Sequence, residues 1–278
     1  MAADKAAFVS NGENVSLITE KLRVSYAQRQ VIDGLDLTLP TGKVSVLIGS
    51  NGCGKSTLLK AMARLITPQS GAVTLDGMDI HATSSAKVAR KLAILPQTPV
   101  APEGITVRQL VSLGRFPYQN WLRQWSVEDD RHVDEALRLT ATTALQHRPV
   151  EALSGGQRQR VWIAMTLAQA TDTLLLDEPT TWLDLAHQVE ILELLRDLNR
   201  RQGKTIIMVL HDLNLACRYA DHLVAIREGQ VVAEGAPQQI MTEALVSHVF
   251  NLRCRIIDDP FFHTPMCIPF PGDHHAEP

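Results

Sequence analysis

Short apolar runs alternate with longer segments of helical character along most of this chain. The clearest apolar runs lie at 92–95, 173–176, 205–210 and 223–227, and long helical patterns separate several of them. Between residues 15 and 47, alternating or β-branched segments are punctuated by turn signals such as Asp33-Gly34. The pattern predicts antiparallel strands near the start, followed by a mainly parallel sheet with helices on both faces, which is an α/β fold.

The segment 187–203 has the most regular helical period. Its apolar positions form one stripe, and its charged residues stay mostly outside that stripe. The stripe consists of Val189, Leu192, Leu195 and Leu198. Gly203 then supplies a C-terminal stop, because glycine readily adopts the left-handed conformation that ends many helices.

Local composition divides the chain into stretches. Residues 1–15 are small and polar and predict a mobile tail, residues 16–250 form the main domain, and residues 251–278 form a C-terminal extension. Within the main domain, residues from about 98 to 165 are polar, rich in Arg and Gln, and expected to be helical mainly after Pro117. We interpret them as a helical insertion. No internal repeat is visible, which argues against two tandem copies of one domain.

The bulk composition is that of an ordinary folded protein, with 278 residues, 45% hydrophobic content, 21% charged content and a net charge of -3. It lacks the basic excess typical of nucleic-acid binding, so no nucleic-acid partner is expected. No apolar run approaches the roughly 20 residues that span a bilayer, so any membrane role should be peripheral.

The four cysteines, at positions 53, 217, 254 and 267, form no CxxC pair and have no histidine cluster around them. This spacing argues against a zinc site or a disulfide framework and favours a reducing cytosol. We interpret Cys217, Cys254 and Cys267 as packed thiols. Two adjacent histidines, His274 and His275, lie in a loose terminal stretch, and we expect no metal there.

The stretch GSNGCGKST lies between a predicted strand and a predicted helix, and it meets the pattern G-x-x-x-x-G-K-[ST]. Glycines let backbone N–H groups close around phosphates, Lys55 adds a positive charge, and the Ser56 hydroxyl can ligate Mg²⁺. A glycine-rich turn with an exposed lysine is the weaker alternative, given the flanking strand and helix. The predicted phosphate-binding members are Gly49, Ser50, Asn51, Gly52, Cys53, Gly54, Lys55, Ser56 and Thr57.

Cys53 stands in the middle of this loop. Phosphate binding uses backbone N–H groups, Lys55 and Ser56, none of which needs a sulfur atom, so we interpret the thiol as a small filler. Its place beside the phosphate site still makes it a candidate for alkylation that blocks ATP binding.

Two adjacent acids, Asp177 and Glu178, end the apolar strand at 173–176. Asp177 can hold the Mg²⁺ shell through water, and Glu178, pointing differently, can polarise a water for attack on a γ-phosphate. Solvation after a core strand is the alternative. Pro179, which fixes the turn that follows, favours a built site.

The stretch LSGGQRQR follows the helical insertion. Ser154 can cap a helix whose first turn holds Gly155 and Gly156, and such a helix end attracts anions. Alone, this pattern is more typical of an ordinary capped helix. Its position before the acid pair, however, matches an order of motifs that indicates a nucleotide-binding protein family.

These motifs, in this order, resemble those of the ATP-binding cassette (ABC) ATPases over residues 17–270. Besides the loop and the acid pair, Gln97 closes LAILPQ, LSGGQ occupies 153–157, and His211 follows a strand in VLHD. The resemblance implies a P-loop NTPase fold. It comprises a mainly parallel RecA-like sheet core, an antiparallel β subdomain and a helical subdomain.

The resemblance also implies roles. Tyr26 stacks on adenine, Gln97 senses Mg²⁺ and the γ-phosphate, Glu178 activates water, and His211 contacts the γ-phosphate. The implied ligands of Mg²⁺ are Ser56, Gln97 and Asp177. In this family the signature of one subunit completes the ATP site of another, so a homodimer, or pairing with a similar subunit, is expected. The residues expected to act across it are Ser154, Gly155, Gly156 and Gln157. Asp184 corresponds to the family's D-loop acid and is expected among the ATP-binding residues.

Further stretches resemble the branch that imports ferric siderophores, with the greatest likeness to the ferric enterobactin type. They are GRFPYQNW at 114–121, TTWLDLAHQ, HDLNLACRYADHL at 211–223, GAPQQI at 235–240 and LRCRIIDDPFFHTPMCIPF at 252–270. Two departures stand out: Ser50 replaces a common proline, and Trp182 stands where a small residue is frequent. Neither removes a phosphate ligand.

An ATPase of this branch is expected at the cytoplasmic face of the bacterial inner membrane, bound to integral membrane permease subunits. A periplasmic or lipoprotein siderophore-binding protein would serve it indirectly. The alternatives are import of another metal chelate such as haem or vitamin B12, and a soluble ABC ATPase acting on ribosomes or DNA. A P-loop kinase of small metabolites fits poorly with LSGGQ and His211.

The segment 98–125 is the candidate permease-facing surface, because it carries several aromatic side chains. These are Phe116, Tyr118, Trp121 and Trp125. The same aromatics could equally fill the core of the helical insertion, and the sequence favours neither interpretation.

Overall fold

The computed structural model describes residues 15–26, 29–119 and 124–271. The expectations for residues 1–14, for Trp121 and for His274 and His275 lie outside this part of the chain.

The central element is a six-stranded sheet with the order β10-β9-β3-β8-β7-β6. Its strands are β3 (Val44–Ile48), β6 (Leu92–Leu95), β7 (Thr173–Leu176), β8 (Thr205–Val209), β9 (His222–Arg227) and β10 (Gln230–Gly235). Neighbouring strands are parallel except for β10, which pairs antiparallel with β9. The predicted mainly parallel sheet is confirmed, and the apolar runs at 92–95 and 173–176 coincide with β6 and β7.

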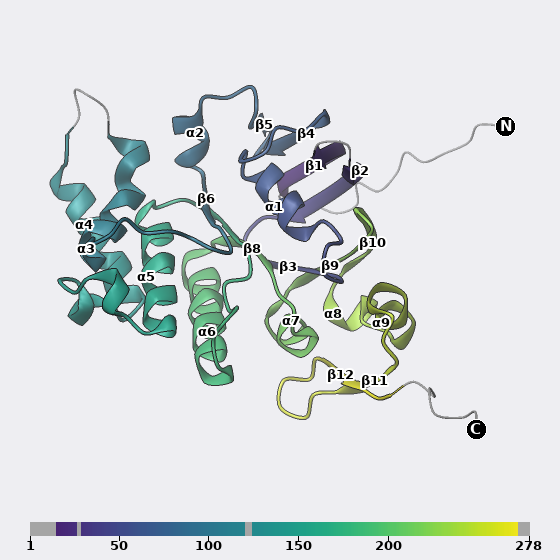
Figure 1. Ribbon diagram of the computed structural model, residues 1–278. Helices are drawn as coiled ribbons and strands as arrows, with labels where there is room; N and C mark the ends of the chain where they lie inside the picture. Colours follow the sequence, from purple (N-terminus) through teal and green to yellow (C-terminus); the bar gives the residue numbers. More distant parts are fainter. Residues whose placement is uncertain (1–14, 27–28, 120–123, 272–278) are drawn as a thin grey trace.

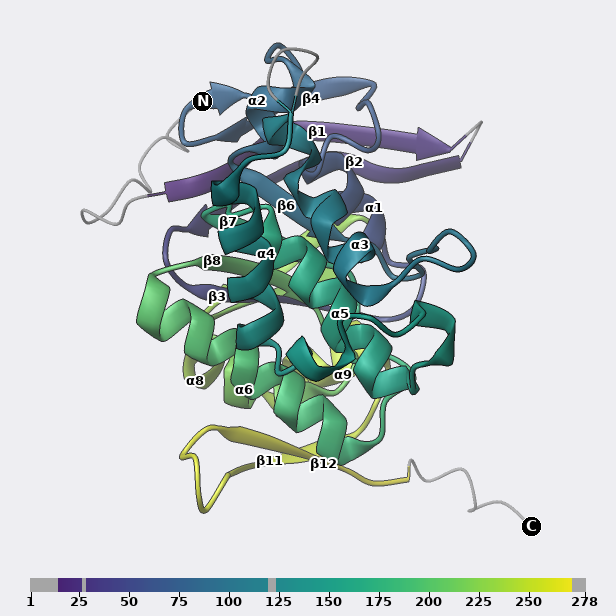
Figure 2. The same ribbon diagram turned by 90° about the vertical axis from the view of Figure 1, so that its left-hand side faces the viewer.

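A second, antiparallel sheet lies above one face of the first (Figure 1), in the order β2-β1-β4-β5. Its strands are β1 (Val15–Tyr26), β2 (Arg29–Pro40), β4 (Ser70–Leu75) and β5 (Met78–Asp79). Helix α1 (Lys55–Met62) lies between the two sheets, as Figures 1 and 2 both show. Its buried Leu58, Leu59 and Met62 join one hydrophobic cluster with residues of both sheets.

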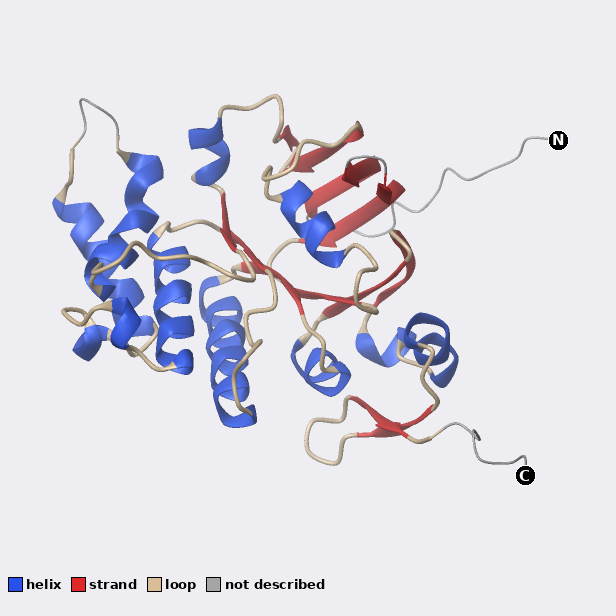
Figure 3. Cartoon of the chain, viewed as in Figure 1, coloured by secondary structure: helices blue, strands red, loops and turns tan. Residues whose placement is uncertain are grey.

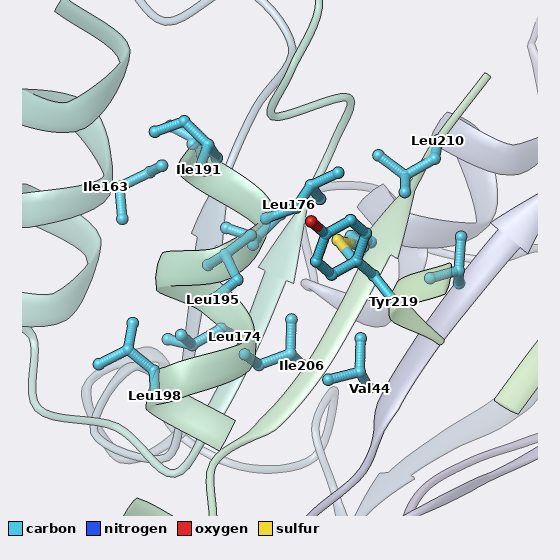
Figure 4. Packing of buried hydrophobic residues seen from close by; sticks show 14 of the residues in the cluster. Val44, Ile163, Leu174, Leu176, Ile191, Leu195, Leu198, Ile206, Leu210 and Tyr219 are labelled. Atoms are coloured by element: carbon cyan, nitrogen blue, oxygen red, sulfur yellow. The ribbon is translucent and has the colours of Figure 1, made fainter. Parts of the chain in front are cut away.

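The opposite face of the six-stranded sheet packs on α5 (Gly155–Ala168), α6 (Leu185–Gln202) and α7 (Leu213–Tyr219). Leu174 and Leu176 belong to the cluster on this face, and Leu175 belongs to the cluster around α1. This alternation follows from the two-residue period of a strand. Figure 4 shows Leu174 and Leu176 close to the α6 stripe, where each fully buried leucine contributes about 1.5–3 kcal/mol relative to an exposed one.

The structure of α6 agrees with its sequence pattern, with one shift. Leu192, Leu195 and Leu198 are buried, but Ile191 is buried in place of the half-buried Val189. The helix ends at Gly203, which has a φ of 66°, as predicted.

The segment between β6 and β7 is mostly helical and lies at one side of the molecule (Figures 1 and 3). It contains α3 (Val107–Ser112), a 3₁₀ helix over Leu113–Tyr118, α4 (Val127–Leu139), two short 3₁₀ turns (Thr143–Leu145 and Val150–Ala152) and α5. The expectation that this segment is helical mainly after Pro117 is confirmed by α4 and α5. The shorter α3 precedes Pro117, and Pro117 itself lies in the 3₁₀ helix. A capping box formed by Thr106 and Gln109 starts α3.

The remaining helices are α2 (Ser85–Ala89), which precedes β6, and α8 (Pro237–Ile240) and α9 (Glu243–Phe250), which follow β10. The chain then forms a hairpin of β11 (Cys254–Asp258) and β12 (Pro265–Pro269) beside α7 (Figure 3). The Asn214 side chain exchanges two hydrogen bonds with the Cys267 backbone, and Arg218 pairs with Asp259 at 2.9 Å. These contacts fasten the hairpin to α7.

All four cysteines are buried free thiols, so the prediction of packed thiols at Cys217, Cys254 and Cys267 is confirmed. Among the described residues, no helix combines the length and apolar character needed to cross a membrane.

Candidate functional site

The predicted phosphate loop connects the end of β3 to the start of α1. Gly54 caps α1 with a φ of 110°, a conformation that side chains disfavour. At Gly49, an added Cβ would stand 2.3 Å from the Ile226 carbonyl oxygen and 2.7 Å from the Cys53 sulfur. Only glycine therefore fits at position 49, and the first turn of α1 directs its unpaired N–H groups into the loop.

Lys55 is 5% exposed and lies within this loop. Its ammonium nitrogen donates to the carbonyl oxygens of Gly49 at 2.7 Å and of Ser50 at 2.9 Å. These two bonds fold the lysine side chain back along the loop, so that a positive charge stands beside the N-terminus of α1. A helix N-terminus and a lysine together favour an anion such as a phosphate.

Cys53 is also 5% exposed, and its sulfur packs against Gly49 and lies 3.7 Å from the Lys55 nitrogen. The thiol fills the space left by a glycine, which agrees with its interpretation as a filler.

Asp177 follows β7 and is buried. Its Oδ1 accepts a hydrogen bond from the Ser56 hydroxyl at 2.8 Å, and its Oδ2 is buried without a hydrogen-bond partner. Burial raises the pKa of this carboxyl group despite the Ser56 hydrogen bond and the nearby Lys60 and Lys55 charges. A buried carboxylate oxygen without a partner, next to a hydroxyl, is the kind of oxygen donor set that Mg²⁺ prefers.

Glu178 is the next residue and is held by three side chains. Its Oε1 lies 2.7 Å from His211 Nε2, and its Oε2 accepts from Gln97 Nε2 at 2.8 Å and from the Thr181 hydroxyl at 2.9 Å. Burial raises the pKa of Glu178, but the hydrogen bonds and the His211 ring outweigh burial, so the pKa lies below its ordinary value. The carboxylate is therefore ionised and fixed in orientation at neutral pH.

The backbone of Glu178 supports this orientation, since its φ is 52°. A left-handed conformation is uncommon for a non-glycine residue and recurs at functional sites. The two adjacent acids reach different partners, Asp177 bonding to Ser56 and Glu178 to Gln97, Thr181 and His211.

A pocket of about 830 Å³ opens over the phosphate loop. Its wall includes Tyr26, the loop residues from Ser50 to Thr57, Glu178 and His211. Tyr26 is 48% exposed and lines the pocket, so its ring is accessible to a flat ligand. The structure thus brings together the predicted aromatic, phosphate, base and histidine positions from four separate parts of the chain.

The LSGGQ residues lie elsewhere, at the start of α5, and do not line this pocket among the described residues. Ser154 caps α5 as predicted: its hydroxyl accepts from the Gln157 N–H at 3.3 Å, and the Gln157 side chain accepts from the Ser154 N–H at 3.2 Å. Asp184 caps α6. One chain therefore presents a phosphate loop and a separate anion-attracting helix end.

Two contacts were missed from the sequence. Thr181 bonds to Glu178, and His187 bonds to Asp184 while packing on Gly156. The spacing of Asp184 and His187, an N-cap and the third residue of its helix, is a local pattern that the sequence shows. The packing of His187 on Gly156 joins two helices and has no local sequence signal.

The chain matches the model of the ABC transporter family over residues 32–181. It is 69% identical over 255 residues to the achromobactin transport ATP-binding protein CbrD of Dickeya dadantii, covering 92% of this chain and 95% of the relative. It is 50% identical over 250 residues to the ferric enterobactin transport ATP-binding protein FepC of Escherichia coli, covering 90% and 92%.

A solved structure described as an inward-facing conformation of a metal-chelate type ABC transporter shares the fold. Its TM-score is 0.79 at 28% identity, with 92% of this chain and 98% of that chain covered. With a phosphate loop, an acid pair and a capped LSGGQ helix in one chain, this protein belongs to the ABC transporter family, among its ATP-binding subunits.

Proposed function

We propose that this chain is the MgATP-hydrolysing subunit of a bacterial importer that takes up an iron(III)-siderophore through a membrane permease. The observation that carries the ATPase part is the triple support of Glu178 by Gln97, Thr181 and His211 at the edge of the phosphate-loop pocket.

ATP binding would place the triphosphate on the loop and the adenine on the exposed ring of Tyr26. Backbone N–H groups at the start of α1 and the Lys55 ammonium would hold the phosphates. Binding requires Lys55 to exchange its bonds with Gly49 and Ser50 for bonds to phosphate oxygens. Because those bonds are internal to the loop, the exchange needs no movement of the sheet.

Mg²⁺ would be held by Ser56 and Asp177, with Gln97 beside them. The unpartnered Oδ2 of Asp177 and the adjoining Ser56 hydroxyl support this assignment. The ion would neutralise charge that develops on the transferred phosphoryl group.

Glu178 would accept a proton from the attacking water. Its pKa, held below the ordinary value, keeps the carboxylate ionised, and its three partners keep it in one orientation. A positioned base of this kind contributes about 10²–10⁴-fold to the rate. His211, bonded to Glu178 and lining the pocket, would also contact the γ-phosphate.

The second half of each site would come from another copy of the chain. The capped helix end at Ser154, Gly155, Gly156 and Gln157 and the D-loop acid Asp184 lie outside the pocket of their own chain. In a homodimer they would close over the ATP of the partner. ATP then binds the closed state better, and hydrolysis removes the bridging phosphate and lets the dimer open.

A permease would receive this motion on the helical insertion. Phe116 is 76% exposed and Trp125 is 40% exposed, which supports the surface interpretation of these two aromatics, and the neighbouring Leu113 is 49% exposed. Tyr118 differs, because it stacks under the buried Arg115 at 3.9 Å. The protein would then sit peripherally on the cytoplasmic face of the inner membrane, and a siderophore-binding protein would act through the permease.

The siderophore assignment rests on the relatives, of which one is named for achromobactin and one for ferric enterobactin. An ATPase subunit does not touch the transported chelate, so its residues do not encode the ligand. We propose a division into an ATPase domain at 16–250, with its helical subdomain at about 98–165, and an extension at 251–278.

The test is uptake in a strain that lacks this gene. Cells would be given labelled ferric achromobactin, ferric enterobactin, haem and vitamin B12, and complemented with the wild type or with Lys55→Ala. We expect the wild type, but not Lys55→Ala, to restore uptake of one ferric siderophore. Purified protein should show ATPase activity that Lys55→Ala abolishes.

The remaining outcomes separate the alternatives. Restored uptake of haem or vitamin B12 alone would replace the siderophore by another chelate. Unchanged uptake of all four compounds, together with failure to copurify with any membrane complex, would favour a soluble ABC ATPase.

A further inference from the structure

The N-termini of helices α5 and α6 meet at a contact between Gly156 and His187. Asp184 caps α6, and its Oδ1 accepts a hydrogen bond from the His187 backbone N–H at 3.0 Å. The same oxygen lies 2.8 Å from Nδ1 of the His187 ring. A ring nitrogen facing a carboxylate at this distance carries the proton and donates it. The ring is therefore bonded through Nδ1 to an oxygen that the helix N–H also holds.

The ring lies against the first turn of α5. A Cβ added to Gly156 would stand 2.7 Å from Cδ2 of His187 and 3.2 Å from its Nε2. Real Cβ atoms do not approach ring atoms this closely, so the ring fills the space that any side chain at position 156 would need. The α5 backbone at Gly156 rests directly on the imidazole edge.

The first turn of α5 is also the part of that helix with N–H groups that have no intrahelical partner. Ser154 and Gln157 cap the turn reciprocally, and Gly156 is the second residue of the helix. The position of these N–H groups is thus set from two sides, by the capping box and by the His187 ring beneath Gly156.

We propose that His187 is a positioning residue, which transmits the place of the Asp184 cap to the Gly156 backbone and so aligns the α5 N–H groups with a phosphate. The phosphate is the γ-phosphate of ATP on a second copy of this chain, so the proposal rests on the dimeric ATP site proposed above. His187 itself touches neither the nucleotide loop nor the pocket of its own chain, and its effect is confined to the closed dimer.

The expected result follows from this placement. Removing the ring leaves Gly156 without its support, and a misplacement of about 1 Å at a phosphate-binding group can cost about 100-fold in rate. His187→Ala should lower kcat about 10- to 100-fold while the Kd of ATP for the isolated subunit stays within about twofold of the wild type. His187→Asn, whose amide can still donate to Asp184, should recover most of the lost kcat.

The matched control is His132→Ala. His132 is another helical histidine paired with a carboxylate, Glu128, at 3.1 Å. It lies on α4 and contributes to neither the α5 cap nor the α6 cap. It should keep wild-type kcat. Equal loss of kcat in both variants would overturn the proposal, as would wild-type kcat in His187→Ala.

A second measurement separates this inference from the proposed dimer. In a Glu178→Gln background, ATP-dependent dimerisation is followed by size-exclusion chromatography with and without His187→Ala. We expect the single variant to dimerise and the double variant to need at least about tenfold more protein. If the single variant dimerises and the double variant dimerises equally well, the His187 proposal fails alone; if the single variant stays monomeric, the dimeric site fails first.

A purely structural role is also tested. Thermal unfolding of His187→Ala should stay within about 2 °C of the wild type, because the ring is half exposed and the Asp184 bond to the helix N–H remains. A large fall in Tm that His187→Asn does not restore would overturn the positioning role.

Discussion

Glu178 and His211 face each other at the edge of the phosphate-loop pocket, with Oε1 and Nε2 2.7 Å apart. The carboxylate is 9% exposed and the imidazole is 44% exposed. The acid is thus largely shielded from bulk water, and both side chains line the pocket in which a γ-phosphate would lie. This arrangement allows one carboxylate to act as a base without being neutralised by burial.

Glu178→Gln should keep ATP binding and lower kcat by about 10²–10⁴-fold, because the amide retains the shape of the side chain but cannot accept the proton. ATP should then trap a dimer. Steady-state phosphate release and equilibrium ATP binding measure the two effects. Glu135→Gln, which alters an exposed acid paired with Arg138 on α4, is the control and should retain wild-type turnover. Fast turnover in Glu178→Gln would place the base elsewhere.

Local sequence signals predicted much of this site. The phosphate loop, the acid pair after β7 and the Ser154 cap each occupy a few consecutive residues. The loop and the cap make their hydrogen bonds within that span, whereas the acid pair bonds to distant residues, Ser56, Gln97 and His211. Short patterns of glycine, serine and acids at a strand end indicate few structures other than turns, helix caps and ligand sites.

The missed features depend on contacts between distant segments. The buried pair of Arg115 and Asp129 joins the 3₁₀ helix to α4, and His187 reaches from α6 to α5. Neither contact follows a regular spacing in the sequence, because which side chains meet depends on how the helices pack. The short α3 was not predicted, although the Thr106 and Gln109 capping box that starts it is a local signal.

Asp129→Asn should destabilise the fold by about 3–5 kcal/mol, because it leaves the Arg115 guanidinium buried without its charge partner. The two side chains are 2% and 1% exposed, and Nε and Oδ1 are 2.9 Å apart. Urea unfolding at pH 7 measures the loss. Glu135→Gln, which breaks an exposed pair, should cost at most about 1 kcal/mol. A similar loss of unfolding free energy in both variants would show that burial of the Arg115–Asp129 pair does not determine its contribution to stability.

The same pair predicts a pH dependence. Burial raises the pKa of Asp129, but hydrogen bonds from Ser126 and Arg115 outweigh it, so the pKa lies below its ordinary value. A carboxyl group of this kind stabilises the fold fully above its unfolded-state pKa of about 3.9, and the contribution is lost as the pH falls through the folded-state pKa. Wild-type stability should therefore fall more steeply below about pH 4 than that of Asp129→Asn.

Cys53→Ser should retain ATPase activity and lose sensitivity to N-ethylmaleimide, because the thiol fills space beside Gly49 and makes no bond that phosphate binding needs. Burial raises the pKa of Cys217 and of Cys267 to about 12, so neither forms a thiolate near neutral pH. Mass spectrometry of the alkylated wild type should find Cys53 modified first, and ATP should slow that reaction. Inactivation of Cys53→Ser at the wild-type rate would contradict this assignment.

Trp182 is 90% exposed and adopts a φ of 67°, although bulky residues rarely take this conformation. It precedes Asp184 by two positions, and the neighbouring Leu185 is 66% exposed. In the proposed dimer this aromatic would be buried against the second copy. Buried tryptophans of this kind contribute about 2 kcal/mol or more to an interface, so Trp182→Asn in the Glu178→Gln background should weaken ATP-dependent dimerisation at least about tenfold. Asparagine tolerates the left-handed backbone, so the unfolding free energy of the monomer should not fall.

Phe261→Ala provides the matched control for this substitution, since Phe261 is 85% exposed but lies in the β11–β12 hairpin. It should leave dimerisation unchanged, as followed by sedimentation velocity at several protein concentrations with and without ATP. If Trp182→Asn dimerises like the parent while Phe261→Ala does not, the hairpin rather than the D-loop forms the contact. The exposed Trp182 side chain would then be a candidate contact for the permease instead of the second copy.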